Sequence, residues 1–382
     1  MHDKLLENYQ TIFGHAPTGM IRSPGRVNII GEHTDYNDGF VFPIAIDHAT
    51  HIAFSPRQDT TIIAHSLNFN KKIEIDLNDD TPPGKITWRE YIRAVVQVFK
   101  NTFKQTLHGF NAVIYSDVPM GAGLSSSASF ELAIAKVLSE VNHIPWDKAR
   151  IARLCQKAEN TWVGVNCGIM DQLICAIAEK NHASLIDCRD LSSQLAPLPD
   201  NTVIIILDTD TRRGLVASAY NERRQQCETA AKTLGINALR DISYEHLLQQ
   251  SALLDPLVFR RAKHVVSENE RVLRAMQAMR DQDPVLLGVL LYQSHQSLDQ
   301  DYEVTNEALN IMVECAMATE GCYGARMTGA GFGGCAIALV NKEFADSFKQ
   351  TVAGCYEERT GLVPAIYMTS ANDGCSSNSV ER

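Results

Sequence analysis

The sequence lacks the features that mark membrane proteins and nucleic-acid-binding proteins. Its longest apolar stretches, such as 203–207, have the length of a strand and fall far short of the ~20 residues that a membrane span needs. The N-terminus, residues 1–14, is amphipathic and has no apolar run of signal-peptide length. With 35 Lys and Arg against 45 Asp and Glu, the net charge is -10, which argues against a broad nucleic-acid surface. We therefore expect neither a membrane nor a nucleic acid as a partner.

Metal and disulfide patterns are also missing. The ten cysteines form no C-x-x-C pair and are scattered through apolar segments. Without a secretion signal, this pattern predicts free buried thiols rather than disulfides, and a cytoplasmic protein. His33 has no second His or Cys at ligand spacing, so no metal site is predicted there.

The length of 382 residues suits two domains of about 150 residues or more each, and no internal repeat is visible. The stretch 197–201, with two prolines, is the best boundary and gives domains of residues 1–196 and 197–382. Strands and helices mix without a βαβ rhythm, which predicts an α+β fold. The small, polar residues 371–382 are expected to be frayed.

Periodicity and turn residues predict the individual elements. Strands are expected at 39–46, 51–55, 61–66, 71–77, 110–115, 203–207, 323–328 and 335–340. Helices are expected at 4–13, 88–103, 125–141, 147–160, 256–280, 285–297 and 344–358.

The strongest local signal is V-P-M-G-A-G-L-S-S-S-A-S at 118–129. Two glycines permit a tight backbone path, and three serines follow where a helix should begin. A helix start offers about four unpaired N–H groups and roughly half a positive charge, which suits nucleotide phosphates. A plain turn leading into a capped helix is the alternative. The lysine of a Walker A loop is absent, so the positive charge for catalysis must come from elsewhere.

A second glycine-rich run, G-A-G-F-G-G at 329–334, formally contains G-x-G-x-x-G. The dinucleotide fingerprint requires a helix after this run, whereas the residues at 335–340 have the pattern of a strand. We interpret it as a loop between two strands that lies close to another backbone or to a ligand.

Residues 23–39, S-P-G-R-V-N-I-I-G-E-H-T-D-Y-N-D-G, concentrate Arg, Glu, His and two Asp around glycines. A sugar site needs many directional donors and acceptors, and carboxylates accept from pairs of hydroxyls. A solvated surface loop would have a similar composition, so this block alone leaves both readings open.

Together the three blocks resemble the galactokinase pattern of the GHMP kinase superfamily, which comprises galactose, homoserine, mevalonate and phosphomevalonate kinases. Residues 25–36 are similar to the galactokinase signature, 119–129 to the superfamily's ATP motif and 328–334 to its third motif. The order matches, and the resemblance runs from about residue 18 to about residue 368. It implies two α+β domains with the active site in the cleft between them.

Matching positions imply roles for single residues. Asp171, in the run G-I-M-D-Q, corresponds to the base that takes the proton of the sugar's anomeric hydroxyl, and Arg26 to the neighbour that keeps it ionised. The substrate-binding positions are Glu32, His33, Thr34, Asp35 and Tyr220. The nucleotide positions are Ser66, Gly121, Ala122, Gly123, Leu124, Ser125, Ser126 and Ser127, and the Mg²⁺ ligands are Ser127 and Glu159.

Without the resemblance, Asp171 could equally cap a helix, Glu159 could be a solvated charge and Tyr220 could pack at a surface. The third block departs from the pattern at Ala330, where many members have glycine. Alanine in a tight loop matters only if its φ is positive.

The implied function is ATP-dependent phosphorylation of α-D-galactose at the anomeric hydroxyl, giving galactose 1-phosphate and ADP and opening the Leloir pathway. Mg²⁺ is the implied cofactor, ATP the co-substrate, and we expect a monomer. An N-acetylgalactosamine kinase and a catalytically silent galactose sensor that binds a regulatory protein remain as alternatives. The intact serines 125–127 and Asp171 argue against the sensor, because binding alone needs neither a Mg²⁺ ligand nor a base.

Overall fold

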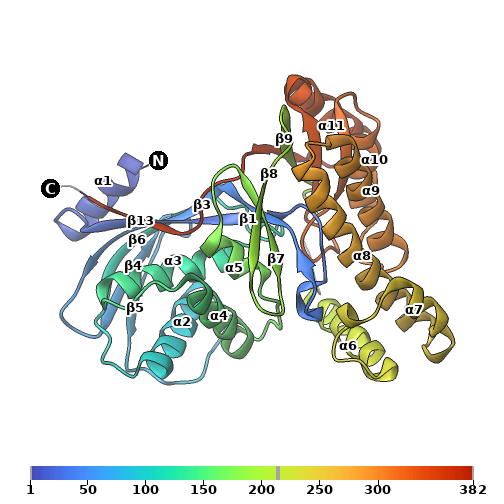
Figure 1. The fold of residues 1–382 in the computed structure, drawn as a ribbon. Coiled ribbons are helices and arrows are strands. Elements are labelled where there is room, and N and C mark those ends of the chain that lie inside the picture. Colours follow the sequence, from blue (N-terminus) through green and yellow to red (C-terminus); the bar gives the residue numbers. More distant parts are fainter. Residues whose placement is uncertain (1, 212–215, 381–382) are drawn as a thin grey trace.

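The computed structural model describes residues 2–211 and 216–380. A six-stranded sheet underlies the N-terminal half, with the strand order β13-β1-β3-β6-β4-β5 (Figure 1). Its described pairs are antiparallel, except that β4 and β6 run parallel. The strands are β1 (Gly19–Asn28), β3 (Pro43–Pro56), β4 (Thr61–Ser66), β5 (Lys71–Asp76), β6 (Phe110–Ser116) and β13 (Ser376–Ser379).

Helices cover both faces of this sheet because side chains on a strand alternate between the faces. On β3, Ile52 and Phe54 join the larger core, beneath four helices, while Ala53 packs with Leu5 and Tyr9 of the single helix on the other face. The helices are α1 (His2–Phe13) on that second face, and α2 (Trp88–Phe103), α3 (Ser126–Val141), α4 (Lys148–Ala158) and α5 (Met170–Ile177) on the first.

The C-terminal half is built on a four-stranded sheet of order β10-β11-β9-β12. Ile205 and Leu207 of β9 pack under its helices, whereas Ile204 and Ile206 face a core that they share with Val27 and other residues of the first half. That shared core joins the two halves. The strands are β9 (Thr202–Asp208), β10 (Cys322–Met327), β11 (Cys335–Asn341) and β12 (Ala365–Thr369). The helices are α6 (Val216–Leu234), α7 (Tyr244–Gln249), α8 (Pro256–Arg280), α9 (Pro284–Gln300), α10 (Glu307–Met317) and α11 (Ala345–Thr360).

A small sheet of β2 (Phe40–Val41), β7 (His182–Asp187) and β8 (Ser193–Pro197) lies between these layers, and the sequence analysis did not predict its last two strands.

The predicted α+β class is confirmed, with helices against largely antiparallel sheets. The bounds predicted for α2 and α8 are those observed, because each helix has a regular apolar face and clear end signals. Within the described ranges, none of the helices has an apolar stretch long enough to cross a bilayer.

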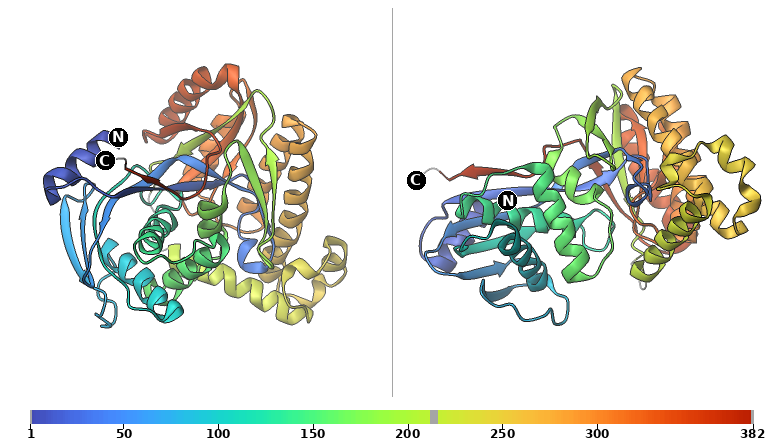
Figure 2. Two further views of the ribbon diagram at one scale, coloured as in Figure 1. Left: turned by 60° about the vertical axis from the view of Figure 1, so that its left-hand side comes forward. Right: turned by 60° about the horizontal axis from the view of Figure 1, so that its bottom comes forward.

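One strand prediction and the expectation of a frayed C-terminus were wrong. Separate strands were expected at 39–46 and 51–55, whereas the structure has the short β2 and one continuous strand, β3. The polar residue Asp47 does not break β3, because it is exposed and accepts hydrogen bonds from Ser370 N (3.0 Å) and Asn372 Nδ2 (2.9 Å). The expected frayed end instead contains β13, which pairs with β1 from Gly19↔Ser379 to Arg22↔Ser376. A strand that pairs with an open sheet edge is held by backbone hydrogen bonds and needs no apolar side chains. The polar composition of residues 371–382 therefore did not indicate a strand. In every view α1 and β13 lie at the same end of the molecule (Figures 1 and 2).

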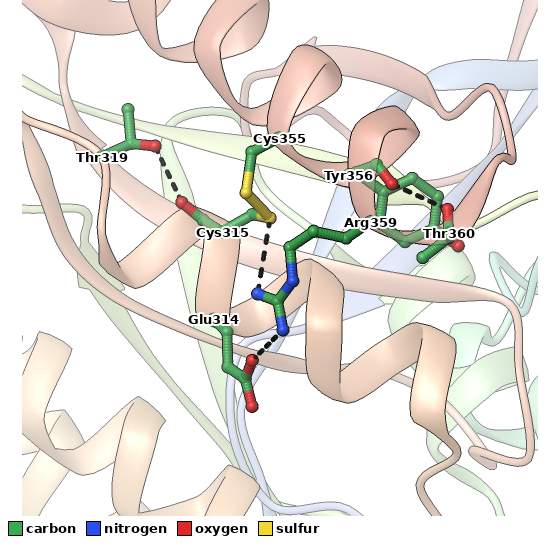
Figure 3. Close-up of a disulfide and its surroundings, with 7 residues drawn as sticks. All are labelled: Glu314, Cys315, Thr319, Cys355, Tyr356, Arg359 and Thr360. Carbon is green, nitrogen blue, oxygen red and sulfur yellow. Dashed lines mark hydrogen bonds and ion pairs between the residues drawn. A yellow bond between two sulfur atoms is a disulfide. The ribbon is translucent and has the colours of Figure 1, made fainter.

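The expectation of free thiols was wrong for one pair. Cys315 of α10 and Cys355 of α11 form a disulfide with a Cα–Cα distance of 5.9 Å (Figure 3). The two cysteines are 40 residues apart, so only the packing of the two helices brings them together. Arg359 donates to Glu314 at 2.6 Å beside the bridge. The other eight cysteines are not disulfide-bonded, and most are buried.

Candidate active site

A cavity of about 450 Å³ collects residues from five distant parts of the sequence. Its walls come from the end of β1 and the turn after it, the loop before α3 with the first turn of that helix, the segment from the end of α4 into the first turn of α5, the helix α6, and the loop between β10 and β11. The predicted site residues that line it are Arg26, Glu32, His33, Asp35, Gly121, Gly123, Leu124, Ser125, Ser126, Ser127, Glu159, Asp171 and Tyr220.

Three predicted residues do not line this cavity. Thr34 is buried, and its hydroxyl donates to the carbonyls of Gly31 (2.8 Å) and Phe40 (2.6 Å). Ala122 is part of the core. Ser66 ends β4, where its hydroxyl accepts from Phe69 N at 3.3 Å.

The loop before α3 has the path that its sequence predicts. Gly121, Gly123 and Ser125 all have positive φ, and the helix begins at Ser126. Strand β1 anchors this loop, since Arg26 donates from its backbone N to Leu124 O at 3.1 Å and from Nη1 to Gly123 O at 2.5 Å. The N–H groups of the first turn are therefore held at the cavity wall, as phosphate binding requires.

Arg26 and Asp171 form a bidentate ion pair at the centre of the site. Arg26 Nε donates to Asp171 Oδ1 at 2.9 Å and Nη2 to Oδ2 at 2.8 Å, while the Ser125 hydroxyl also donates to Oδ2. Burial lowers the pKa of Arg26, but the nearby carboxylates of Asp171 and Glu32 outweigh that effect and raise it. Asp171 lies in the first turn of α5, where the helix dipole also favours its negative charge.

Asp35 lies across the cavity and is packed tightly against Gly168. A Cβ on Gly168 would lie 1.7 Å from Asp35 Oδ2, so only glycine leaves room for the carboxylate. Burial and the charge of Asp171 raise the pKa of Asp35 to about 7. Tyr220 of α6 closes this side, with its ring centroid 5.5 Å from that of His33.

His33 bridges the two halves of the protein in its neutral form. Its Nε2 lies 3.2 Å from Ala330 O, which only accepts, so Nε2 carries the hydrogen. Nδ1 then accepts from the Tyr36 hydroxyl at 2.7 Å. Burial lowers the pKa of His33 to about 3.

Glu32 holds the loop between β10 and β11 against the first half. It accepts from Gly329 N at 2.6 Å and Thr328 Oγ1 at 3.2 Å, and it pairs with Arg326 at 3.1 Å. Burial raises its pKa. These protein bonds already engage both of its carboxylate oxygens. Ala330 is not among the residues with positive φ, so its replacement of glycine carries no strain, and the strand β11 after the loop confirms that this is no dinucleotide fingerprint.

Glu159 begins a single turn of π-helix, Glu159–Val163, which follows α4. Such turns are frequent at functional sites. Burial and the charge of Asp171 raise the pKa of Glu159 to about 7, and the nearby Ser127 hydroxyl offsets part of that rise. The described residues contain no cluster of three metal-binding side chains. Mg²⁺ at a nucleotide needs only one or two carboxylates, because phosphates and water supply the remaining oxygens, so Ser127 and Glu159 fit this ion.

Sequence reasoning missed several residues that hold this site. Glu268 of α8 accepts from Gly31 N at 2.9 Å and from Ser294 Oγ at 2.6 Å, and the charge of Arg271 helps lower its pKa to about 2 despite burial. Arg326 donates to Glu32, Asn28 O and Ile29 O. Glu268 lies far from the three blocks, among polar neighbours that give it no signal, and Arg326 lies just before the third block, where a charge within an apolar run is the only signal.

Known proteins share both the sequence and the fold. The galactokinase galactose-binding signature matches residues 7–56, the GHMP kinases N terminal domain 90–179 and the GHMP kinases C terminal model 275–357. The galactokinase of Roseiflexus sp. is 43% identical, over 97% of this chain and 96% of its own. That of Haemophilus influenzae is 42% identical, over 97% and 98%.

Among solved structures, Lactococcus lactis galactokinase complexed with galactose superimposes with a TM-score of 0.95 at 36% identity, covering 98% of this chain and 99% of that one. A mevalonate kinase at 19% identity, with a TM-score of 0.68, shares the fold. The cavity, its phosphate loop and these matches agree: the chain belongs to the galactokinase family of the GHMP kinases.

Proposed function

We propose that the protein transfers the γ-phosphoryl group of ATP to the anomeric hydroxyl of α-D-galactose. The observation that carries this proposal is the Asp171 carboxylate, held between Arg26 and Ser125 beside the phosphate loop. A sugar hydroxyl placed there would lie between a proton acceptor and the phosphates. The galactose complex of the similar L. lactis enzyme supports the choice of sugar.

In the proposed reaction Asp171 accepts the proton of the anomeric hydroxyl, whose oxygen forms the new bond to the γ-phosphorus as the bond to ADP breaks. Arg26 aims the carboxylate through its two hydrogen bonds, and its charge offsets negative charge that develops on the phosphoryl oxygens. Phosphoryl transfer depends mainly on positioning and charge neutralisation. General-base help typically contributes 10²–10⁴-fold, so Asp171 supplies the smaller share of the rate.

The sugar contacts that we propose are Asp35, His33 and Tyr220, which face the cavity together. We propose that Glu32 and Thr34 shape the cavity wall and do not bind the sugar directly, because their side-chain oxygens already hydrogen-bond to protein groups. We propose that Ser127 and Glu159 hold Mg²⁺, which would neutralise the phosphates. Leu124 and the glycines of the loop present their backbone N–H groups to the phosphates, while Ser66 and Ala122 lie off the cavity wall.

We also propose a cytoplasmic monomer with domains 1–196 and 197–382. Eight of the ten cysteines lie outside the Cys315–Cys355 disulfide, which supports the first. The strand β9, which starts the second sheet at Thr202, supports the boundary, and β13 is the part of the second segment that returns to the first sheet.

ADP release, measured with galactose, N-acetylgalactosamine, glucose and mevalonate as acceptors, tests the function. We expect ADP above background with galactose and the largest kcat/KM for it. Galactose that raises the Tm without releasing ADP would instead support a sensor, and preference for N-acetylgalactosamine would reassign the substrate.

A further inference from the structure

Two buried side chains with no part in the proposed reaction lie behind the Glu159 carboxylate. Gln172 of α5 donates from Nε2 to Glu159 Oε2 at 2.7 Å and to Glu131 Oε2 at 3.2 Å. Gln172 and Glu131 are both 0% exposed. An amide has two N–H hydrogens, so Gln172 commits both of them to carboxyl groups, one from α3 and one from the π-turn.

This arrangement is not explained by packing. Glu131 Oε1 and Gln172 Oε1 have no hydrogen-bond partner among the described residues. Unpaired buried polar atoms are costly, and an apolar pair of similar shape would avoid that cost. Burial, reinforced by the charge of Glu159, also raises the pKa of Glu131 well above its usual range. Because these buried polar groups lower the stability of the fold, their presence points to a role in the active site that adjoins them.

The bonds to Glu159 suggest what that role is. Gln172 binds Glu159 Oε2, and the Cys167 thiol lies 3.5 Å from the same oxygen. The second oxygen of Glu159 is then left for Ser127 and for a ligand in the cavity. Glu131 in turn fixes the rotation of the Gln172 amide, because its carboxyl oxygen accepts the other hydrogen.

We propose that Gln172 and Glu131 are positioning residues that orient the Glu159 carboxylate for a divalent cation. This rests on the proposed function, which takes Glu159 as a cation ligand. Neither side chain lines the cavity, so their effect on the cation passes through Glu159.

The test measures direct binding of Mn²⁺, a probe for the Mg²⁺ position, to the full chain in the presence of ADP. The electron paramagnetic resonance signal of free Mn²⁺ reports how much of the ion is bound. Gln172→Met keeps the side-chain length and removes the donor. We expect a roughly 10-fold weaker Mn²⁺ affinity, since a hydrogen bond to a charged group is lost. Galactose affinity should be unchanged, and kcat should recover at high Mg²⁺, which a loss of folding would not allow.

A double-mutant cycle tests the order of action. Glu131→Met should weaken Mn²⁺ binding in the wild-type background and have no further effect in Gln172→Met, because it removes the oxygen that orients the Gln172 amide. Asn142→Leu is the matched control. Asn142 is a buried amide that caps the C-terminal end of α3, the helix of Glu131, and bonds to His108, so its loss should lower the Tm and leave Mn²⁺ affinity intact.

Glu159→Gln separates the two proposals. If it weakens Mn²⁺ binding and Gln172→Met does not, the positioning role is overturned while the cation site stands. If Glu159→Gln has wild-type Mn²⁺ affinity, the cation site itself is wrong and the inference falls with it. Should Gln172→Met fail to fold, Gln172→Leu also removes the donor and must show the same loss.

Discussion

The carboxylate of Asp35 occupies the space that a side chain on residue 168 would take, with 1.7 Å between Oδ2 and the position of a Cβ on Gly168. Gly168→Ala should therefore displace Asp35 from the cavity wall. Galactose affinity should fall by roughly 10- to 100-fold, the worth of a hydrogen bond to a charged group, while ATP affinity is retained. Isothermal titration calorimetry measures both.

The matched control is Gly354→Ala in α11, where a Cβ would meet nothing within 4 Å. It should be neutral or slightly stabilising, because alanine is the better helix former. Wild-type galactose affinity in Gly168→Ala would show that Asp35 is not part of the sugar site.

The raised pKa of Asp35 predicts how stability changes with pH. Its pKa is about 7 in the folded protein against an ordinary 3.8, so the folded state holds the proton more tightly between these values. This contribution is fully present below pH 3.8 and is lost as the pH rises through 7. Each such group contributes a slope of at most about 1.4 kcal/mol per pH unit. In ligand-free protein, Asp35→Asn should flatten the fall of unfolding free energy between pH 5 and 7.

Asp59 provides a control of opposite sign. Its bond with Arg57 lowers the pKa of Asp59 to about 2, so its contribution is present above pH 3.8 and lost as the pH falls toward 2. Asp59→Asn should leave the slope between pH 5 and 7 unchanged. An Asp35→Asn profile parallel to wild type over that range would contradict the assigned titration.

Arg26 and Asp171 should behave as one catalytic unit. Asp171→Asn keeps the shape but removes the charge and the proton acceptor, so kcat at saturating ATP, Mg²⁺ and galactose should fall by at least about 10². Arg26→Ala should lose turnover too, and the double variant should be scarcely worse than the worse single, because coupled groups are non-additive. Circular dichroism checks the fold. Fully multiplicative losses would mean independent action, and near-wild-type turnover in Asp171→Asn would exclude the base role.

The disulfide predicts a thiol count. Denatured, unreduced protein should show eight reactive thiols by Ellman's reagent, and ten after reduction. Closing a loop across a separation of 40 residues should contribute about 2–4 kcal/mol to the free energy of unfolding. Reductant should lower the Tm of the wild type and not that of Cys315→Ser. Neither cysteine lines the cavity, so turnover should not change. Ten thiols before reduction would contradict the bridge.

The sequence predicted those parts of the protein in which neighbouring residues decide the structure. The phosphate loop and α2 follow from local glycines, serines and apolar periodicity. Placing Arg26 against Asp171 needed the family resemblance, because 145 residues separate them. Glu268 and Gln172 could not be predicted at all, since Glu268 meets Gly31 and Gln172 meets Glu131 only when segments distant in the sequence pack together. The strand β13 was not predicted, because its side chains are polar and show no alternation of apolar and polar residues.

That strand also affects the order in which the protein can fold. β13 occupies the edge of β1 in the first sheet, yet it is synthesised about 350 residues later, which at roughly 5–20 residues per second means tens of seconds of translation. Until residues 376–379 emerge, β1 presents an open edge that can pair with another nascent chain. The first sheet to begin forming is therefore among the last parts of the fold to be completed, and its unfinished edge is where aggregation during synthesis should start.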